Sequence, residues 1–292
     1  VAAQVFDSTS NKIGNEFLVN TAITNFQDQA TLTALNDGGF LATWRDQGPH
    51  SGIYFDDSIK AQRFDNGGSK VGGEIYVNTV NNPQYSESFP VVTVLSNGNF
   101  VIAWVTNDPS VGDSDKGIAG QLFDSNGNKI GNDFRVNTYT NGLQTSPAIT
   151  ALADNGFMVT WGTYDPATGD QYGVTAQRFD QNANKIGSEF LVNSVTEGVQ
   201  NFPAIASILD GSVVISWNSP ANGEVAAKLY HSAGLNTVVT DVLANDTDVD
   251  LTDDPSNFSL DSASVQGDKG QVAIKNNKLV FTAGHDFDYL AD

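Results

Sequence analysis

The 292-residue sequence predicts an all-β fold: a β-propeller-like array of four four-stranded repeats, each about 57 residues long, followed by a partial β-sandwich module. Two repeated blocks support this prediction. The first has the form AQxFD followed by NKIGxEFxVN and occurs at 3–20, 61–78, 120–137 and 176–193. The second ends in Trp44, Trp104, Trp161 and Trp217. Clusters of Asn, Gly and Asp separate the apolar runs throughout, as turns separate strands.

Each repeat contains four short apolar runs, which we interpret as four antiparallel strands. In the third repeat we expect them at 148–152, 157–161, 174–179 and 189–192. No apolar pattern of helical spacing extends over 11 residues, so a helical fold is excluded. A stack of β-sandwich modules is the alternative architecture. The first residues match a third strand, so a ring could close if 3–20 completed the blade begun by 204–217.

Composition excludes several classes of function. The chain has 34 Asp and Glu against 14 Lys and Arg, a formal charge of -20, which disfavours partners that need a basic surface, such as nucleic acids and anionic membranes. It has no Cys, so disulfides, thiolate metal sites and Cys nucleophiles are impossible. No apolar run has the length of a membrane-spanning helix, and we expect no membrane insertion.

Residues present in every repeat are expected to serve the scaffold. The tryptophans are expected to pack between neighbouring blades. A glutamine in each third strand is expected to bond the backbone, and the aspartate before each tight turn is expected to accept backbone N–H groups. An acid that we place at the start of each fourth strand is expected to be solvated. These positions are Gln4, Gln62, Gln121 and Gln177; Asp7, Asp65, Asp124 and Asp180; and Glu16, Glu74, Asp133 and Glu189.

Loops that differ between repeats are the expected binding surface. Strand parity places the loops after the tryptophans and between the blades on one face, and only these vary in length and content. Their aromatic side chains could contact a sugar or a peptide; the alternative is that they only hold the loops in place. The candidate ligand-binding residues are Tyr54, Phe55, Tyr164, Tyr172, Tyr85 and Tyr139, with Phe26 and Phe202 beside them.

The repeats stop near residue 232, and we divide the chain into a propeller-like domain at 1–232 and a partial calcium-binding module at 233–292. The second part contains alternating aspartates, whose oxygens suit Ca²⁺; a solvated acidic turn is the alternative. The expected calcium ligands are Asp246, Asp248, Asp250, Asn245, Asp253 and Asp254. A second, smaller acidic cluster comprises Asp108, Asp113 and Asp115.

The segment DVLANDTDVD and the residues up to Asp292 resemble the cadherin-like, VCBS-type modules of large exported bacterial adhesins. The repeated AQxFD and EFxVN blocks resemble segments of RTX-type, calcium-dependent surface proteins. The resemblance implies a secreted or cell-surface protein whose neighbours are further modules of one long chain.

The function that we expect from the sequence is a non-catalytic adhesion module that binds a cell-surface or extracellular glycan or protein. The linear motifs of phosphate-binding loops, zinc proteases and serine hydrolases are absent, and the three His lie in unrelated contexts. Two alternatives stay open. One is a polysaccharide-acting propeller hydrolase, whose two carboxylates need no linear motif, and the other is a pure structural spacer.

Overall fold

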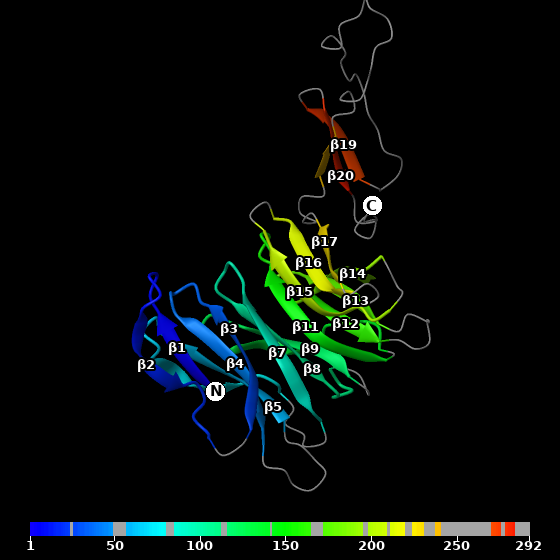
Figure 1. The fold of residues 1–292 in the computed structure, drawn as a ribbon. Coiled ribbons are helices and arrows are strands. Elements are labelled where there is room, and N and C mark those ends of the chain that lie inside the picture. The colour runs from blue at the N-terminus through cyan, green and yellow to red at the C-terminus, as the bar shows by residue number, and fades with distance from the viewer. Residues whose placement is uncertain are drawn as a thin grey trace, which may run out of the picture. The chain divides into compact units, whose positions relative to one another are not determined.

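The computed structural model describes thirteen stretches of the chain: residues 1–23, 26–48, 57–79, 85–111, 116–140, 142–164, 172–194, 198–208, 211–219, 224–230, 237–240, 270–275 and 278–283. Every regular element within them is a β-strand, which confirms the predicted all-β class (Figure 1). By contact clustering, the chain divides into two compact units, Val1–Ile208 with Val214–Leu229, and Leu209–Val213 with Tyr230–Asp292.

Three antiparallel sheets have the four strands predicted for a propeller blade. The first full blade is β3 (Gln27–Ala34), β4 (Phe40–Gln47), β5 (Asp57–Phe64) and β6 (Lys70–Tyr76). The second is β7 (Glu87–Val94), β8 (Phe100–Thr106), β9 (Gly117–Phe123) and β10 (Lys129–Arg135). The third is β11 (Leu143–Ala151), β12 (Phe157–Tyr164), β13 (Gly173–Phe179) and β14 (Lys185–Leu191). In each blade the strands pair in sequence order.

Three further sheets have fewer strands. The N-terminal hairpin pairs β1 (Ala2–Phe6) with β2 (Lys12–Leu18), which match the third and fourth strands of a blade. The last sheet holds β15 (Asn201–Ser207), β16 (Val213–Ser219) and β17 (Glu224–Tyr230). Here β17 pairs with β16 and takes the third-strand position of this sheet. The ring closure considered from the sequence would have placed β1 at that position. In the second unit, β20 (Lys278–Ala283) lies between β18 (Thr237–Thr240) and β19 (Gly270–Lys275).

The fourth strands begin earlier than the sequence suggests. In the third full blade the strand starts at Lys185, four residues before Glu189, the start expected from the sequence. Gly187 causes the difference: its φ of 68° interrupts the pairing with β13 between Arg178 and Ala176. A left-handed glycine inside a strand is typical of a bulge. The NKIG segment is therefore the bulged start of the strand.

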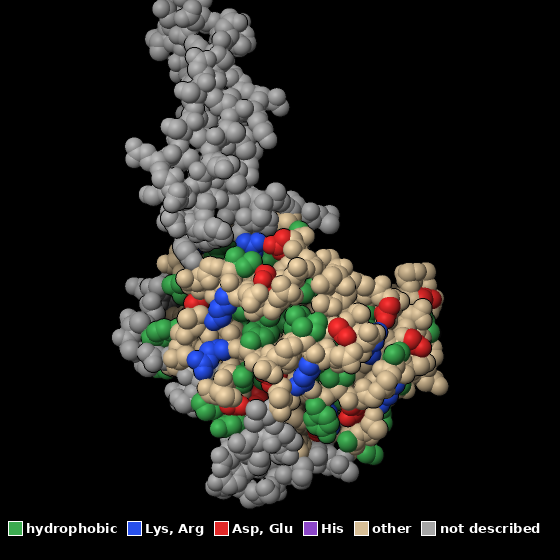
Figure 2. Space-filling view, turned by 180° about the vertical axis from the view of Figure 1, so that it is seen from behind, with side chains coloured by type: hydrophobic (Ala, Val, Ile, Leu, Met, Phe, Trp, Pro, Cys, Tyr) green, Lys and Arg blue, Asp and Glu red, His purple; other side chains and the backbone are tan. Residues whose placement is uncertain are grey.

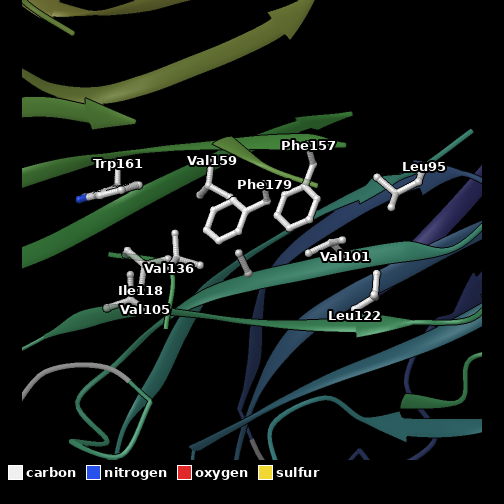
Figure 3. Close-up of a cluster of buried hydrophobic side chains, with 11 residues drawn as sticks. Leu95, Val101, Val105, Ile118, Leu122, Val136, Phe157, Val159, Trp161 and Phe179 are labelled. Atoms are coloured by element: carbon white, nitrogen blue, oxygen red, sulfur yellow. The ribbon is translucent and has the colours of Figure 1, made fainter. Parts of the chain in front are cut away.

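Hydrophobic side chains fill the space between successive blades. The first strands β3, β7, β11 and β15 pack against one another in that order. Between the second and third full blades, Trp161 is 1% exposed and Phe157 and Phe179 are fully buried among aliphatic side chains of the preceding blade (Figure 3). Trp104 lies in the equivalent cluster one blade earlier. The predicted role of the tryptophans in packing between blades is therefore confirmed.

Within each full blade, two phenylalanines from the second and third strands stack. Phe157 and Phe179 have ring centroids 4.8 Å apart and an interplanar angle of 5°. Phe40 with Phe64 and Phe100 with Phe123 repeat this geometry at 4.8 and 4.9 Å. Such pairs add to the stabilisation that burial of the rings supplies.

The repeated aspartates and glutamines stabilise turns and bulges, as predicted. Asp124 Oδ1 accepts bonds of 2.9 and 2.8 Å from the backbone N–H groups of Asn126 and Asn128. A side-chain bond from Asn128, followed by these backbone bonds, lowers the pKa of Asp124. Gln62 Nε2 donates bonds of 3.0 and 3.2 Å to the carbonyls of Arg63 and Val71, beside the bulge between β5 and β6. The other copies make the same bonds.

A polar contact that we call the latch joins consecutive blades, so the expectation that the fourth-strand acids are solvated is wrong for three of the four. Asp133 on β10 accepts bonds of 2.6 and 2.7 Å from the backbone N–H and the hydroxyl of Thr79, which follows the preceding blade. Lys129 Nζ donates a 2.9 Å bond to the same hydroxyl. The equivalent latches are Glu74 and Lys70 with Thr21, and Glu189 and Lys185 with Thr138.

A second bulge interrupts every first strand at the same position. Gln29, Phe89, Ser146 and Phe202 have φ values of 54°, 52°, 52° and 50°, in the left-handed region that non-glycine residues seldom adopt. The described pairings of β3, β7 and β11 shift register there. Gln29 Oε1 accepts a 2.6 Å bond from the backbone N–H of Phe89, so two consecutive bulges are linked.

The described surface mixes acidic, basic and apolar side chains (Figure 2). In the described residues, no helix is long and apolar enough to span a membrane.

Candidate active site

The sequence-predicted ligand-binding residues lie in several separate connections. Tyr164 ends β12 and Tyr172 immediately precedes β13, and their ring centroids are 4.6 Å apart with an interplanar angle of 33°. Tyr85 precedes β7, and Tyr139 follows β10 and is 39% exposed. The structure therefore brings one pair of the candidates together. Tyr54 and Phe55 lie outside the described residues.

The predicted calcium ligands can be compared with the structure at one position. Asp108 is buried and its Oδ1 accepts bonds of 2.9 and 2.7 Å from the backbone N–H and hydroxyl of Ser110. Groups of three or more metal-binding side chains are absent from the stretches that the structure describes. The remaining candidates, Asp113, Asp115, Asn245, Asp246, Asp248, Asp250, Asp253 and Asp254, lie outside those stretches, so calcium binding there stays a prediction.

The first full blade carries a group of charged side chains, of which Asp57 is buried, at the end of its sheet from which the variable loops lead. Arg45 Nε and Nη2 donate bonds of 2.8 and 2.6 Å to the two carboxylate oxygens of Asp28. Arg45 Nη1 lies 4.0 Å from Asp57 Oδ2. Asp57 is the first residue of β5 and is 5% exposed. Buried charges need such partners because their removal from water is costly.

A second ion-pair group lies in the same blade. Lys60 Nζ is 2.5 Å from Asp46 Oδ2 and 3.4 Å from Glu74 Oε2, and Lys60 and Asp46 are each 6% exposed. Burial alone would lower the pKa of Lys60, but the bond to Asp46 and the negative charges around it outweigh burial and raise that pKa. Lys60 therefore keeps its positive charge inside the blade.

Glu87, the first residue of β7, is the buried acid of the neighbouring blade. It is 3% exposed, and burial raises its pKa to about 8, although a bond from Thr106 partly opposes this. Thr106 Oγ1 lies 3.0 Å from Glu87 Oε1. Lys and Arg side chains in the described stretches form no ion pair with Glu87. The carboxyl of Glu87 is thus protonated at neutral pH.

Ser86 connects these groups across two blades. Its hydroxyl donates a 2.9 Å bond to Asp57 Oδ2, and its backbone N–H donates a 2.6 Å bond to Asn107 Oδ1. The neutral acid Glu87 therefore directly follows a residue that bonds the carboxylate of Asp57. Two carboxyl groups in contrasting environments are typical of acid and base pairs.

Sequence reasoning missed these residues, although the repeats contain a signal for them. Glu87 occupies a position that is glutamine in every other copy: Gln27, Gln144 and Gln200. Arg45 likewise stands where the other copies have Val105, Gly162 and Asn218. A residue that departs from the repeat in one blade is therefore a candidate for a role beyond the common scaffold.

Comparison with solved structures finds similar chains among arabinofuranosidases and arabinanases. An α-L-arabinofuranosidase variant from Fusarium graminearum, solved with an iminosugar inhibitor, aligns over 76% of this chain and 63% of its own, with 14% identity and a TM-score of 0.50. The endo-arabinase from Bacteroides thetaiotaomicron aligns over 76% and 81%, with 13% identity and a TM-score of 0.45. An α-L-arabinanase from Penicillium chrysogenum, solved with arabinobiose, aligns over 71% and 58%, with 16% identity and a TM-score of 0.47.

No protein-family model matches the chain. No curated protein sequence matches it either.

These findings correct the identity expected from sequence. The similar structures named above are glycoside hydrolases, not RTX-type adhesins or cadherin-like modules, so the expectations of an adhesin and of a non-catalytic module are wrong. The physical reason is that the repeated blocks encode the scaffold that all blades share. Catalytic carboxyls occur singly and need no linear motif, so the absence of motifs did not exclude an enzyme.

Proposed function

We propose that the propeller is a polysaccharide-acting hydrolase, with Glu87 as the general acid and Asp57 as the partner carboxylate. The buried carboxyl of Glu87, which directly follows the residue that bonds Asp57, is the observation that carries the proposal. The propeller fold, seen also in arabinan-cleaving enzymes, supports a glycan substrate. A secreted or cell-surface location would fit such a substrate.

Glycosidic bond cleavage needs a proton for the leaving oxygen and a carboxylate on the other side of the sugar. Glu87 retains its proton up to about pH 8, so at neutral pH it can donate that proton. Asp57 has Arg45 and Ser86 as partners, which suit a carboxylate that activates water or attacks the anomeric carbon. Ser86 fixes Asp57 relative to the strand that carries Glu87.

The two residues lie at the end of the sheets from which the variable loops lead. Asp57 begins β5 and Glu87 begins β7, so both lie at the end of the sheets that leads into the loops after the tryptophans. Tyr164 and Tyr172 flank the equivalent loop of the third full blade. Their paired rings can contact the apolar face of a sugar and hold a chain across that end.

The proposal is tested with purified protein on arabinan, xylan and aryl arabinofuranosides, with reducing-sugar release as the readout. The Glu87→Gln and Asp57→Asn variants should each lose about 10²- to 10⁴-fold in rate. An aryl substrate with an acidic leaving group needs less protonation, so it should partly restore the Glu87→Gln rate. Glu16→Gln, an exposed acid on β2, is the control and should retain full activity.

The pH profile adds an independent check. Wild-type activity should decline as the pH rises through about 8, where Glu87 loses its proton. If the wild type releases no sugar from any substrate in the panel, or if Glu87→Gln is as active as wild type, the proposal is wrong.

A further inference from the structure

The first full blade holds a lysine between two carboxylates, away from water. Lys60 on β5 and Asp46 on β4 are each 6% exposed, and Lys60 Nζ lies 2.5 Å from Asp46 Oδ2. On the other side of the ammonium group, Glu74 Oε2 on β6 lies 3.4 Å from Nζ. The proposed hydrolysis uses none of these three groups. An amine and a carboxyl are therefore held in contact where little water competes.

The pairing of three adjacent strands fixes this contact. Lys60 pairs with Trp44 on β4, and Asp46, two residues further on, has its side chain on the same face of the sheet. On its other side, Lys60 pairs with Tyr76 of β6, whose ring centroid lies 4.9 Å from Nζ. Glu74 precedes Tyr76 by two residues on the same strand. The sheet thus sets the backbone positions of all three groups.

The other full blades have neutral residues in place of the charged pair. The residues at the positions of Lys60 and Asp46 are Ala119 with Thr106 in the second full blade and Thr175 with Thr163 in the third. Glu74, by contrast, has an acidic equivalent in every copy and takes part in a latch. The scaffold does not need the Lys60–Asp46 pair, and burial of such a pair is costly. Its presence in one blade therefore calls for a separate role.

We propose that Lys60 and Asp46 condense to an intramolecular amide bond that joins β4 to β5. In this reaction Nζ forms a bond to Cγ of Asp46, the bond from Cγ to Oδ2 breaks, and Oδ2 leaves as water. The chain has no Cys, so the amide supplies the kind of covalent cross-link that disulfides supply in other proteins. The cross-link involves neither Glu87 nor Asp57.

Each proton of the ammonium group has a carrier in the structure. The first moves to Asp46 Oδ2, which is in contact with Nζ, and leaves a neutral amine beside a neutral acid. The second passes to Glu74 Oε2 as Nζ attacks Cγ, and Glu74 then gives it to Oδ2, which departs as water. The third stays on the amide nitrogen. Charges balance, and Glu74 ends the reaction as the carboxylate that began it.

Two neighbouring groups favour the reaction. Gln27 Nε2 donates a 3.2 Å bond to Asp46 Oδ1, the oxygen that gains negative charge during the attack. Burial alone would raise the pKa of Glu74, but bonds from Thr21 and the charge of Lys60 outweigh burial and lower that pKa. Glu74 is therefore ionised and can accept a proton. Because the charged form of Lys60 prevails, the amide forms slowly from the minor neutral pair.

Mass spectrometry of the denatured full chain tests the proposal, because an amide survives unfolding and an ion pair does not. Wild type incubated for about a day should be about 18 Da lighter than its sequence mass, through loss of one water. Trypsin should fail to cut after Lys60 and should release residues 46–63 as one peptide that carries this loss. A wild-type mass equal to the sequence mass, or a loss that maps elsewhere, would overturn the proposal.

Variants identify the reacting groups. Asp46→Asn would release ammonia in place of water, so its loss should be about 17 Da, and Lys60→Arg should show no loss. Glu74→Gln should lower the cross-linked fraction about tenfold or more. Glu189→Gln changes the equivalent acid in a blade without the lysine, and should leave that fraction unchanged. A loss of about 18 Da that persists in Asp46→Asn or Lys60→Arg would come from another site and overturn the proposal.

Discussion

The hydroxyl of Thr106 lies 3.0 Å from Glu87 Oε1, and the pair recurs in the next blade as Thr163 with Gln144, whose Oε1 is 2.6 Å from the Thr163 hydroxyl. A threonine at the end of the second strand thus bonds the first residues of the first strand in both blades. In the third full blade the acceptor is the amide of Gln144, and in the second it is the buried carboxyl of Glu87. The same scaffold position therefore holds either a neutral structural group or a titratable one.

We expect Glu87→Gln to change the pH dependence of stability. Glu87 has a pKa of about 8 when folded and an ordinary value of 4.5, so between these pH values the folded protein holds a proton that the unfolded chain releases. The stabilisation that this bound proton gives the folded state is fully present below pH 4.5 and is lost as the pH rises through about 8. At pH 8 the variant should be more stable than wild type by roughly 3 to 5 kcal/mol.

Urea unfolding of both proteins at pH 4.5 and pH 8 measures this difference. Gln144→Glu is the reciprocal variant. It introduces an acid at the equivalent position of the third full blade, so it should lose stability as the pH rises, as the wild type does because of Glu87. Equal pH dependence in wild type and Glu87→Gln would show that Glu87 is ionised in the folded state.

Asp133→Ala should destabilise the protein by about 1 to 3 kcal/mol, because the Thr79 N–H and hydroxyl and Lys129 lose their common acceptor. Thermal melting and urea unfolding would report the change. Glu16→Ala is the matched control at low protein concentration, where its exposed carboxylate has only Lys12 nearby, and it should be nearly neutral. Equal effects of the two variants would mean that the latch does not stabilise the array.

Phe157→Ala should cost roughly 3 to 5 kcal/mol, since it removes a fully buried ring that stacks on Phe179. Phe6→Ala, which truncates a ring that is 55% exposed, should cost less than about 1 kcal/mol in the monomer. Chemical unfolding at a fixed, low protein concentration compares the two. A small effect at Phe157 would contradict the packing described between the second and third full blades.

Tyr164→Ala and Tyr172→Ala should each weaken oligosaccharide binding about fivefold to tenfold, which corresponds to about 1 kcal/mol for one aromatic contact. Calorimetric titration with arabino-oligosaccharides measures the affinity, and melting temperature checks the fold. Substitution in the turn at Asn128, at the opposite end of the sheet, should leave binding unchanged. An equal loss there would overturn the assignment of the binding face.

The prediction of calcium at Asp246 and Asp248 is tested by melting with EGTA and with about 10 mM CaCl₂. The Asp246→Asn and Asp248→Asn double variant is the comparison. A millimolar site would raise the melting temperature of the wild type and leave that of the variant unchanged, with a gain of about 1 to 2 kcal/mol. Identical changes in the melting temperatures of the two proteins would show that the segment does not bind calcium and is a solvated acidic turn.

The parts of the structure that sequence predicts best are those that every repeat contains. Trp104, Asp124 and Gln62 were assigned correctly because four copies show which residues the scaffold needs, and their partners are close in sequence or in the same sheet. The latch was missed because Asp133 bonds a backbone N–H that lies 54 residues away. An acid, a lysine and a Thr or Ser recur at these positions in every copy, but the sequence does not show that the hydroxyl residue of one copy meets the acid of the next.

The candidate site was missed for the opposite reason. Glu87 and Arg45 each occur in one copy only, and their importance depends on burial, which the repeat pattern does not report. The resemblance of the blocks to adhesin segments described composition and spacing, which many unrelated functions share on one scaffold. The useful signal in the sequence was a residue type that occurs in one copy and not in the others. It is seen only when the four copies are aligned with one another.

Each of the four bulges in the first strands reduces the stability of the array. Gln29, Phe89, Ser146 and Phe202 keep a backbone conformation that costs a side-chain-bearing residue roughly 1 to 2 kcal/mol. Glycine would adopt it without that cost, yet all four copies retain a side chain. At Gln29 glycine would also remove the bond to the Phe89 N–H. At Phe89, Ser146 and Phe202, relief of the backbone strain exceeds the cost of about 0.5 to 1 kcal/mol that glycine's freedom in the unfolded chain imposes, so glycine at these three positions should make the array more resistant to heat.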